Sequence, residues 1–249
     1  MDNSTHKEWF GEWFDSPYYH ILYKDRDYTE AQRFIDVLSM FLDFRAEDKI
    51  LDLACGKGRH SIYLNKKGLD VVGVDLSPSN VAYGNRFAND RLSFFEHDMR
   101  FPFRKGEFDY VLNMFTSFGY FDDSEENRKA IISASENLKP SGMMILDFLN
   151  PIKVIRELVA QEQKNVDGYE FKIRRFVDDR NYIVKDIFLE DKGEKLHFQE
   201  RVKAIGKQEF EDYFRSANLG IRGVFGDYSL NAFDPENSDR MIFVTEKED

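Results

Sequence analysis

The chain has 249 residues, of which 42% are hydrophobic and 33% charged, and it carries a formal net charge of −11. This describes a globular protein with one sizeable core, and it argues against nucleic acid or an anionic membrane as the main partner, because both attract Lys- and Arg-rich surfaces. The single cysteine, Cys55, excludes an intramolecular disulfide and a multi-cysteine zinc site. Because no run is long enough for a membrane span and the N-terminus lacks the pattern of a secretion signal, we expect a cytoplasmic protein.

Strand-like and helix-like segments alternate between residues 29 and 150. Apolar residues three and four apart predict a helix over 29–44, begun by a capping box of Thr29 and Gln32. Short apolar runs predict buried strands over 49–54, 69–77, 92–99, 108–115 and, after a turn at 139–142, 143–149. Helices are expected over 59–67, from Ser77-Pro78 onward, and from Asp123-Ser124 to Leu138. Nearly continuous apolar strands separated by helices are typical of a doubly wound, mostly parallel α/β sheet.

The pattern changes after residue 150. Residues 169–205 alternate apolar and polar side chains, with Gly193 in a turn, which predicts a small antiparallel sheet exposed on one face. A helix over 207–218 and two final strands, in IRGVFGDYS and RMIFVTEK, return to the α/β pattern. We therefore expect an aromatic N-terminal arm (1–28), an α/β domain (29–164 and 206–249) and an inserted antiparallel sheet (165–205).

The stretch ILDLACGKGRH at 50–60 places Gly56 and Gly58 between a predicted strand and a predicted helix. A phosphate-binding Walker loop needs Ser or Thr directly after a Gly-Lys pair, whereas here Gly58 follows Gly56-Lys57. A dinucleotide fingerprint needs a third glycine three residues after the second, where this chain has Ser61. The glycines alone therefore leave a dinucleotide site and a turn without ligand as alternatives.

Three aspartates lie around this loop: Asp52 in the first predicted strand, and Asp75 and Asp98 at the ends of the next two. The carboxyl ends of neighbouring parallel strands line one crevice, in which ligands bind. The two oxygens of Asp75 can accept both hydroxyls of a ribose, but they would repel an adjacent phosphate. The three acids together predict a nucleoside without a nearby phosphate.

The motifs ILDLACGKG, VVGVDLS, FFEHDM and FDYVLNMFTSFGYF, in this order and spacing, resemble those of class I S-adenosylmethionine-dependent methyltransferases. The resemblance covers about residues 29–150 and the last two strands. It implies a Rossmann-like sheet of seven strands that ends in an antiparallel hairpin, and S-adenosylmethionine as cofactor. Where the commonest first motif has a glycine, this chain has Ala54, which costs little if its φ is negative.

The resemblance also implies positions for the cofactor. The methionine end would be shaped by Asp52, Ala54, Gly56 and Gly58. Asp75 would hold the ribose, with Leu76 against the adenine. Asp98 would accept from the adenine amino group, with Met99 on the ring, while Asn113 and Met114 would lie beside the sulfonium. For the carboxylate we consider Lys57 and Arg59, with Arg59 first, and we expect His60 on the helix surface.

Methyl transfer from a sulfonium is an in-line displacement from an activated donor, so the protein mainly aligns the acceptor and excludes water. The sequence has no serine-nucleophile elbow, and its five histidines lack metal-ligand spacing, so we expect no metal. An N/D-P-P-Y-like motif, frequent in methyltransferases that act on nucleobase or glutamine nitrogens, is absent after the fourth strand, and Asn150-Pro151 comes one strand later. This favours a small-molecule acceptor of undetermined atom type.

The N-terminal arm is rich in aromatic residues, which are Trp9, Phe10, Trp13, Phe14, Tyr18, Tyr19 and Tyr23. They either anchor the arm to the body or form a lid in which Tyr18 or Tyr19 reaches the ligand, and both interpretations stay open. In similar small-molecule methyltransferases the inserted sheet covers the acceptor or forms a dimer contact, so a monomer and a homodimer are both possible. Tyr19, His20 and Tyr228 are candidates for a base.

Two other functions stay open. A nicotinamide-dependent oxidoreductase is supported by Asp75 and the partial glycine motif but opposed by Ser61 and Asp98. A non-catalytic protein that binds S-adenosylmethionine and reports its level would have the same binding residues.

Overall fold

The computed structural model describes residues 9–24 and 28–248, without the side chains of residues 9, 10 and 28. Most of the expected arm over 1–28 is thus described, but residues 1–8 and 25–27 and the rings of Trp9 and Phe10 lie outside the described set. The chain divides into two compact units, one made of 1–26 with 155–204 and the other of 27–154 with 205–249. The division expected from the sequence differs, because it counted the arm separately and left 155–164 with the α/β domain.

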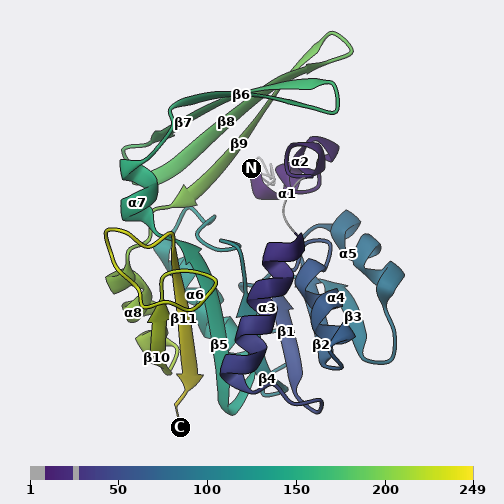
Figure 1. The fold of residues 1–249 in the computed structure, drawn as a ribbon, viewed down its shortest axis with the longest axis vertical. Coiled ribbons are helices and arrows are strands. Elements are labelled where there is room, and N and C mark those ends of the chain that lie inside the picture. The colour runs from purple at the N-terminus through teal and green to yellow at the C-terminus, as the bar shows by residue number, and fades with distance from the viewer. Residues whose placement is uncertain (1–8, 25–27, 249) are drawn as a thin grey trace, which may run out of the picture. The chain divides into compact units, whose positions relative to one another are not determined.

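The larger unit is built on a seven-stranded sheet in the order β10-β11-β5-β4-β1-β2-β3 (Figure 1). Its strands are β1 (Lys49–Leu53), β2 (Asp70–Asp75), β3 (Leu92–Glu96), β4 (Phe108–Asn113), β5 (Leu138–Leu149), β10 (Leu219–Phe225) and β11 (Arg240–Lys247). The pairs among β1 to β5 are parallel, while β11 is antiparallel to both β5 and β10. The doubly wound sheet and its final hairpin are confirmed.

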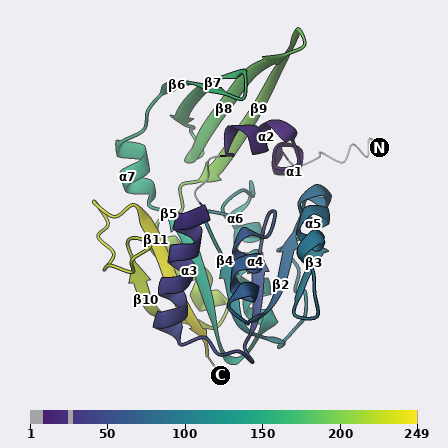
Figure 2. The same ribbon diagram turned by 45° about the vertical axis from the view of Figure 1, so that its right-hand side comes forward.

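Helices cover both faces of this sheet (Figure 2): α3 (Tyr28–Leu42), α4 (Arg59–Lys66) and α5 (Pro78–Gly84) on one, α6 (Ser124–Asn137) and α8 (Lys207–Ser216) on the other. Ser77 caps α5 and Asp123 caps α6, as predicted, because their side-chain oxygens accept backbone N–H groups of the first turn. The predicted capping box of α3 is wrong: the helix begins at Tyr28, so Thr29 lies within its first turn. Two short helical elements, η1 (Asn85–Phe87) and α7 (Pro151–Arg156), follow α5 and β5 in the chain.

The fifth strand begins earlier than predicted. β5 starts at Leu138, and the expected turn at 139–142 is an irregularity within it, with Ser141 at a φ of 58° and a shift in register against β4. Pro140 and Gly142 interrupt the pattern in the sequence but do not end the strand.

The smaller unit contains an antiparallel sheet in the order β6-β7-β8-β9. Its strands are β6 (Gln161–Val166), β7 (Tyr169–Val177), β8 (Tyr182–Asp191) and β9 (Glu194–Lys203). Lys192 and Gly193 both have positive φ values in the two-residue turn between β8 and β9, as Gly193 predicted. The sequence analysis missed β6, because QEQKNV is polar on both faces and shows no alternation.

The N-terminal helices α1 (Trp9–Trp13) and α2 (Pro17–Leu22) pack on this antiparallel sheet. Trp13 is 1% exposed and shares an apolar cluster with Phe171 and Ile187. Its Nε1 and the hydroxyl of Tyr23 both donate to Oε1 of Glu200, each at 2.7 Å. Within the described ranges, no helix combines the length and apolar character that a membrane crossing requires.

Candidate functional site

The glycine turn after β1 has an unusual backbone. Ala54, Gly56 and Gly58 have φ values of 57°, 56° and 79°, so every second residue is left-handed. The turn is closed by backbone hydrogen bonds from Cys55 to Val74 and from Gly58 to Cys55, each 3.0 Å long. The negative φ at which Ala54 would cost little is therefore not adopted, and a β-carbon in this conformation costs about 1–2 kcal/mol.

Replacing Ala54 by glycine is expected to stabilise the protein. Glycine relieves strain of about 1–2 kcal/mol and adds an unfolded-state entropy cost of about 0.5–1 kcal/mol, so Ala54→Gly should raise the free energy of unfolding by about 0.5–1 kcal/mol. Urea denaturation measures this. Ala88→Gly, at a φ of −60°, is the control and should destabilise. An equal decrease in the free energy of unfolding of Ala54→Gly and Ala88→Gly would show that the turn is not strained at Ala54.

Asp75 lies directly against this turn. Its Oδ2 accepts from Gly56 N at 2.8 Å, and its Oδ1 accepts from Ser77 N at 2.9 Å and from Asn80 Nδ2 at 3.3 Å. Asn80 is 3% exposed, and its Oδ1 has no hydrogen-bond partner among the described residues. The sequence analysis did not select Asn80, whose only signal is its place one turn after the acid.

Asp52 is buried beneath the turn, with 1% of its surface exposed. Ser61 Oγ donates to its Oδ2 at 2.6 Å, so the residue that breaks the dinucleotide fingerprint holds the first acid of the motif. Burial raises the pKa of Asp52 to about 7, and the charge of Asp75 adds to this, while the bond from Ser61 and the charge of Arg59 oppose it. The carboxyl can therefore change its protonation near neutral pH.

Asn113 and Met114, at the end of β4, are both buried. Asn113 Nδ2 donates to the carbonyl oxygens of Leu53, at 3.2 Å, and Ser117, at 3.1 Å. These bonds tie the end of β4 to the start of the glycine turn. Oδ1 of Asn113 has no partner within the described part of the chain, so this buried acceptor is available to a ligand.

The next two residues form a strained turn, since Phe115 and Thr116 have φ values of 56° and 60°. Asp147 holds it: Oδ2 accepts from Phe115 N at 2.7 Å, and the backbone oxygen accepts from Thr116 N at 2.9 Å. Arg240 donates to Asp147 Oδ1 at 2.8 Å and to Thr116 Oγ1 at 2.9 Å. Such conformations persist only where the surroundings over-determine them, and they are frequent at functional sites.

Tyr228, on the loop between β10 and β11, packs against this turn. Its ring centroid lies 5.0 Å from that of Phe115 and 4.6 Å from that of Phe34, and its hydroxyl donates to Asp147 Oδ2 at 3.2 Å. Burial, together with the charge of Asp147, raises the pKa of Tyr228 far above its ordinary value, against the opposing charge of Arg240. In this arrangement the phenol keeps its proton.

His60 is not on the helix surface, which corrects the sequence-based expectation. It is 6% exposed, because the first turn of α4 packs its ring on Phe115, with the centroids 5.0 Å apart and the planes at 27°. Burial and the charge of Arg59 lower the pKa of His60 to about 3, so its ring is neutral near neutral pH. Arg59 itself lies over the Phe115 ring, 4.4 Å from its centroid.

The adenine side of the predicted site carries Leu76, which is 39% exposed, and Met99, which is half-buried. Asp98 accepts from Arg100, whose Nη2 lies 2.6 Å from Oδ2. Burial alone would raise the pKa of Asp98, but the bonds from Arg100 outweigh it and lower the pKa, so the carboxylate is ionised. A ligand amino group would have to share this carboxylate with Arg100.

The remaining predicted residues lie in the smaller unit. The hydroxyl of Tyr18 donates to Asp191 Oδ2 at 2.8 Å. Tyr19 packs edge-on against Trp13, with centroids 5.6 Å apart, and its ring is 5.3 Å from that of His20. The structure thus gathers the predicted residues from Asp52 to Met114 and Tyr228 in one unit, and it places Tyr18, Tyr19 and His20 in the other.

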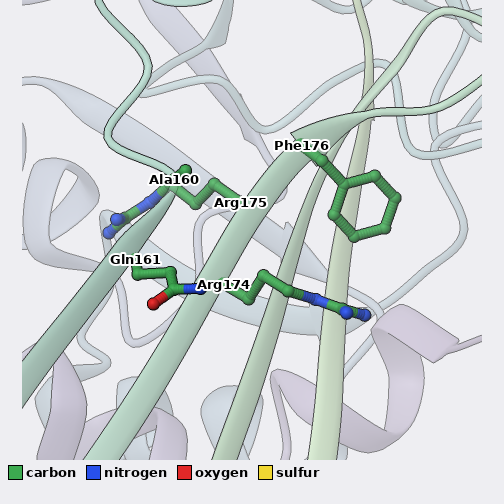
Figure 3. A pocket seen from close by; sticks show the side chains of 5 residues that line it. All are labelled: Ala160, Gln161, Arg174, Arg175 and Phe176. Atoms are coloured by element: carbon green, nitrogen blue, oxygen red, sulfur yellow. The ribbon is translucent and has the colours of Figure 1, made fainter.

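A hollow lies on the antiparallel sheet, where Ala160 and Gln161 adjoin Arg174, Arg175 and Phe176 of β7 (Figure 3). Both arginines are already paired, Arg174 with Asp186 at 2.6 Å and Arg175 with Glu162 at 2.5 Å. This hollow therefore offers a ligand no unpaired arginine. Over the described residues, no group of three or more His, Cys, Asp or Glu side chains is placed to hold a metal ion.

The chain is similar to known proteins in sequence. A family model described as a methyltransferase domain matches residues 50–142. The chain is 30% identical over 131 residues to the dTDP-3-amino-3,4,6-trideoxy-alpha-D-glucopyranose N,N-dimethyltransferase of Streptomyces venezuelae, covering 52% of this chain and 54% of the relative. It is 40% identical over 124 residues to the glycine/sarcosine N-methyltransferase of Parasynechococcus marenigrum, covering 47% and 44%. The matches thus span about half the length of these two relatives.

The fold is similar to that of a crystal structure of an S-adenosylmethionine-dependent methyltransferase from Clostridium acetobutylicum. The TM-score is 0.77 at 22% sequence identity, and the match covers 93% of this chain and 96% of that one. At this identity the likeness concerns the fold, and it extends over both units.

Proposed function

We propose that the chain is a class I S-adenosylmethionine-dependent methyltransferase and that it transfers the methyl group to an amine of a small molecule. The observation that carries this proposal is the match to two relatives whose names both state N-methylation, one of a nucleotide-linked sugar and one of glycine and sarcosine. The part of this chain that matches the methyltransferase family model, residues 50–142, contains the glycine turn and the ends of β1 to β4 in the α/β unit.

The residues of that unit fit S-adenosylmethionine, which is the cofactor. When bound, it supplies a methyl group on a positively charged sulfur. Two buried side-chain oxygens without partners in the described structure, Asn80 Oδ1 and Asn113 Oδ1, can accept hydrogen bonds from a bound molecule. We assign Asp75 with Asn80 to the ribose hydroxyls, and Asn113 with Met114 to the region of the sulfonium.

The other assignments follow the resemblance and are supported by the positions of the residues. Leu76, Asp98 and Met99 are assigned to the adenine. The backbone of Ala54, Gly56 and Gly58, with Asp52 below it, is assigned to the methionine end, and Arg59 to the carboxylate. Tyr18 stays a predicted cofactor contact.

For the transfer itself, we propose that the chain's residues orient the acceptor and exclude water rather than react with it. An amine attacks through its lone pair, so it must enter unprotonated. The turn at Phe115 and Thr116 is proposed as the acceptor wall, since the buried Asp147 accepts from both of its backbone N–H groups. Tyr228 is proposed as part of that wall, because a phenol whose pKa is strongly raised stays protonated and cannot take up a proton, while Tyr19 and His20 remain candidates for the base.

A screen of acceptors tests the proposal. Purified protein, S-adenosylmethionine and a panel of amino sugars, amino acids and other amines are incubated, and S-adenosylhomocysteine is measured. We expect turnover with at least one amine and none with the same scaffold bearing a hydroxyl in place of the amine. Turnover of the hydroxyl compounds alone would overturn the amine assignment. Cofactor binding without turnover across the panel would instead support a non-catalytic protein that binds S-adenosylmethionine and reports its level.

A further inference from the structure

Phe94, the third residue of β3, packs its ring against three glycines from three other parts of the fold. Gly58 closes the turn before α4, Gly73 lies in the middle of β2, and Gly84 ends α5. A β-carbon at Gly58 would lie 2.4 Å from Phe94 Cε1, one at Gly73 would lie 2.6 Å from Cδ1, and one at Gly84 would lie 2.8 Å from Cδ1. The ring is 3% exposed, so it fills a socket that only glycines leave open.

This socket lies beneath the groups that the cofactor needs. Gly73 is the register partner of Phe94 on β3 and of Asp52 on β1, and it precedes Asp75 by two residues. Gly58 receives the hydrogen bond that begins α4, from Ile62 N at 2.8 Å. The ring of Phe94 therefore contacts the backbone of the glycine turn and of β2, the strand that carries Asp75.

We propose that Phe94 is a positioning residue for cofactor binding, which fixes the glycine turn and the end of β2 without touching the cofactor. The proposal rests on the assignment of this edge to S-adenosylmethionine. It gives Gly58 a second reason to be glycine: besides its φ of 79°, the close approach of the ring excludes a side chain. A residue that only fills the core would affect stability and leave the affinity of the folded protein unchanged.

The test is the affinity for S-adenosylhomocysteine, measured by calorimetry well below the unfolding temperature. Phe94→Leu is expected to weaken binding about tenfold, because the smaller side chain no longer supports the turn. The matched control is Phe243→Leu in β11, an equally buried ring that packs on Phe210 and Phe214 at the opposite face, and it should leave the dissociation constant within about twofold. Wild-type affinity in folded Phe94→Leu would overturn the proposal.

Substitutions at both Gly84 and Phe94 test the same contact if Phe94→Leu folds poorly. A β-carbon at Gly84 would meet only atoms of Phe94 within 3.1 Å, so Gly84→Ala should displace the ring and weaken binding. Combining Gly84→Ala with Phe94→Ala should cost less affinity than the sum of the two separate losses, since alanine at position 94 lacks the Cγ and Cδ atoms that the new β-carbon would meet. If the losses of binding free energy in the two single variants simply add up in the double variant, the coupling between residues 84 and 94 is overturned. A wild-type protein that does not bind S-adenosylhomocysteine would contradict the cofactor site itself, which is a different failure.

Discussion

Asp75→Ala is expected to reduce the affinity for S-adenosylmethionine by about 100-fold to 10,000-fold. The carboxylate would lose two charge-assisted hydrogen bonds to the ribose hydroxyls, each worth about 1.5–3 kcal/mol, and about 1.4 kcal/mol corresponds to a factor of ten. The substitution also removes the acceptor of Gly56 N, which holds the glycine turn against β2 at 2.8 Å. Calorimetry with S-adenosylmethionine and S-adenosylhomocysteine measures the loss.

Two further variants separate the contributions. Asp75→Asn keeps the shape and one carbonyl oxygen, so it should lose less affinity than Asp75→Ala. Asp70→Ala, at the other end of β2, should bind like the wild type and controls for damage to the strand. An unchanged dissociation constant in folded Asp75→Ala would place the ribose elsewhere.

Asp52→Asn is expected to stabilise the ligand-free protein at pH 8 by about 2–4 kcal/mol and to have almost no effect at pH 4. The folded-state pKa of Asp52 is about 7, against about 3.9 in the unfolded chain. Between these values the folded protein holds a proton that the unfolded chain has released, so this group's contribution to stability decreases as the pH rises from about 4 to 7. Asparagine keeps the shape without the buried charge.

His60 titrates in the opposite sense over nearly the same range. Its pKa is about 3 in the folded protein, below the ordinary value of 6.5, so its contribution to stability increases as the pH rises from about 3 to 6.5. The two effects offset each other in the wild type. Asp52→Asn should therefore show a steeper increase of stability between pH 4 and 6.5, measured by urea denaturation at each pH. Parallel curves for variant and wild type would contradict the raised pKa of Asp52.

Much of the larger unit is predictable because its signals are local. The strands are short apolar runs bounded by charge or glycine, and Ser77 and Asp123 cap their helices through contacts within three residues. The edge that holds Asp75 and the glycine turn follows from the rule that parallel strands end at one crevice. Their direct contact, the bond from Gly56 to Asp75, agrees with that expectation.

The features that the sequence did not predict depend on distant residues. His60 is buried by Phe115, which lies 55 positions later, and its own neighbours look like a helix surface. The positive φ of Ala54 follows from the closure of the turn on Val74 of β2, not from any preference of alanine. Asp147 and Arg240 meet only because β11 lies beside β5. The polar strand β6 has no apolar face of its own and forms because β7 offers an edge.

The contacts of the N-terminal helices have a consequence during synthesis. Trp13 finds its hydrogen-bond acceptor in Glu200, 187 residues later, and its ring packs on Phe198 of the same strand. At a translation rate of about 5–20 residues per second, the aromatic helices leave the ribosome about 10–40 seconds before their sheet exists. Over that interval their rings are exposed to other chains and to chaperones. Slow translation between α2 and β9 should thus favour aggregation of the nascent chain, even though the finished protein buries the ring of Trp13.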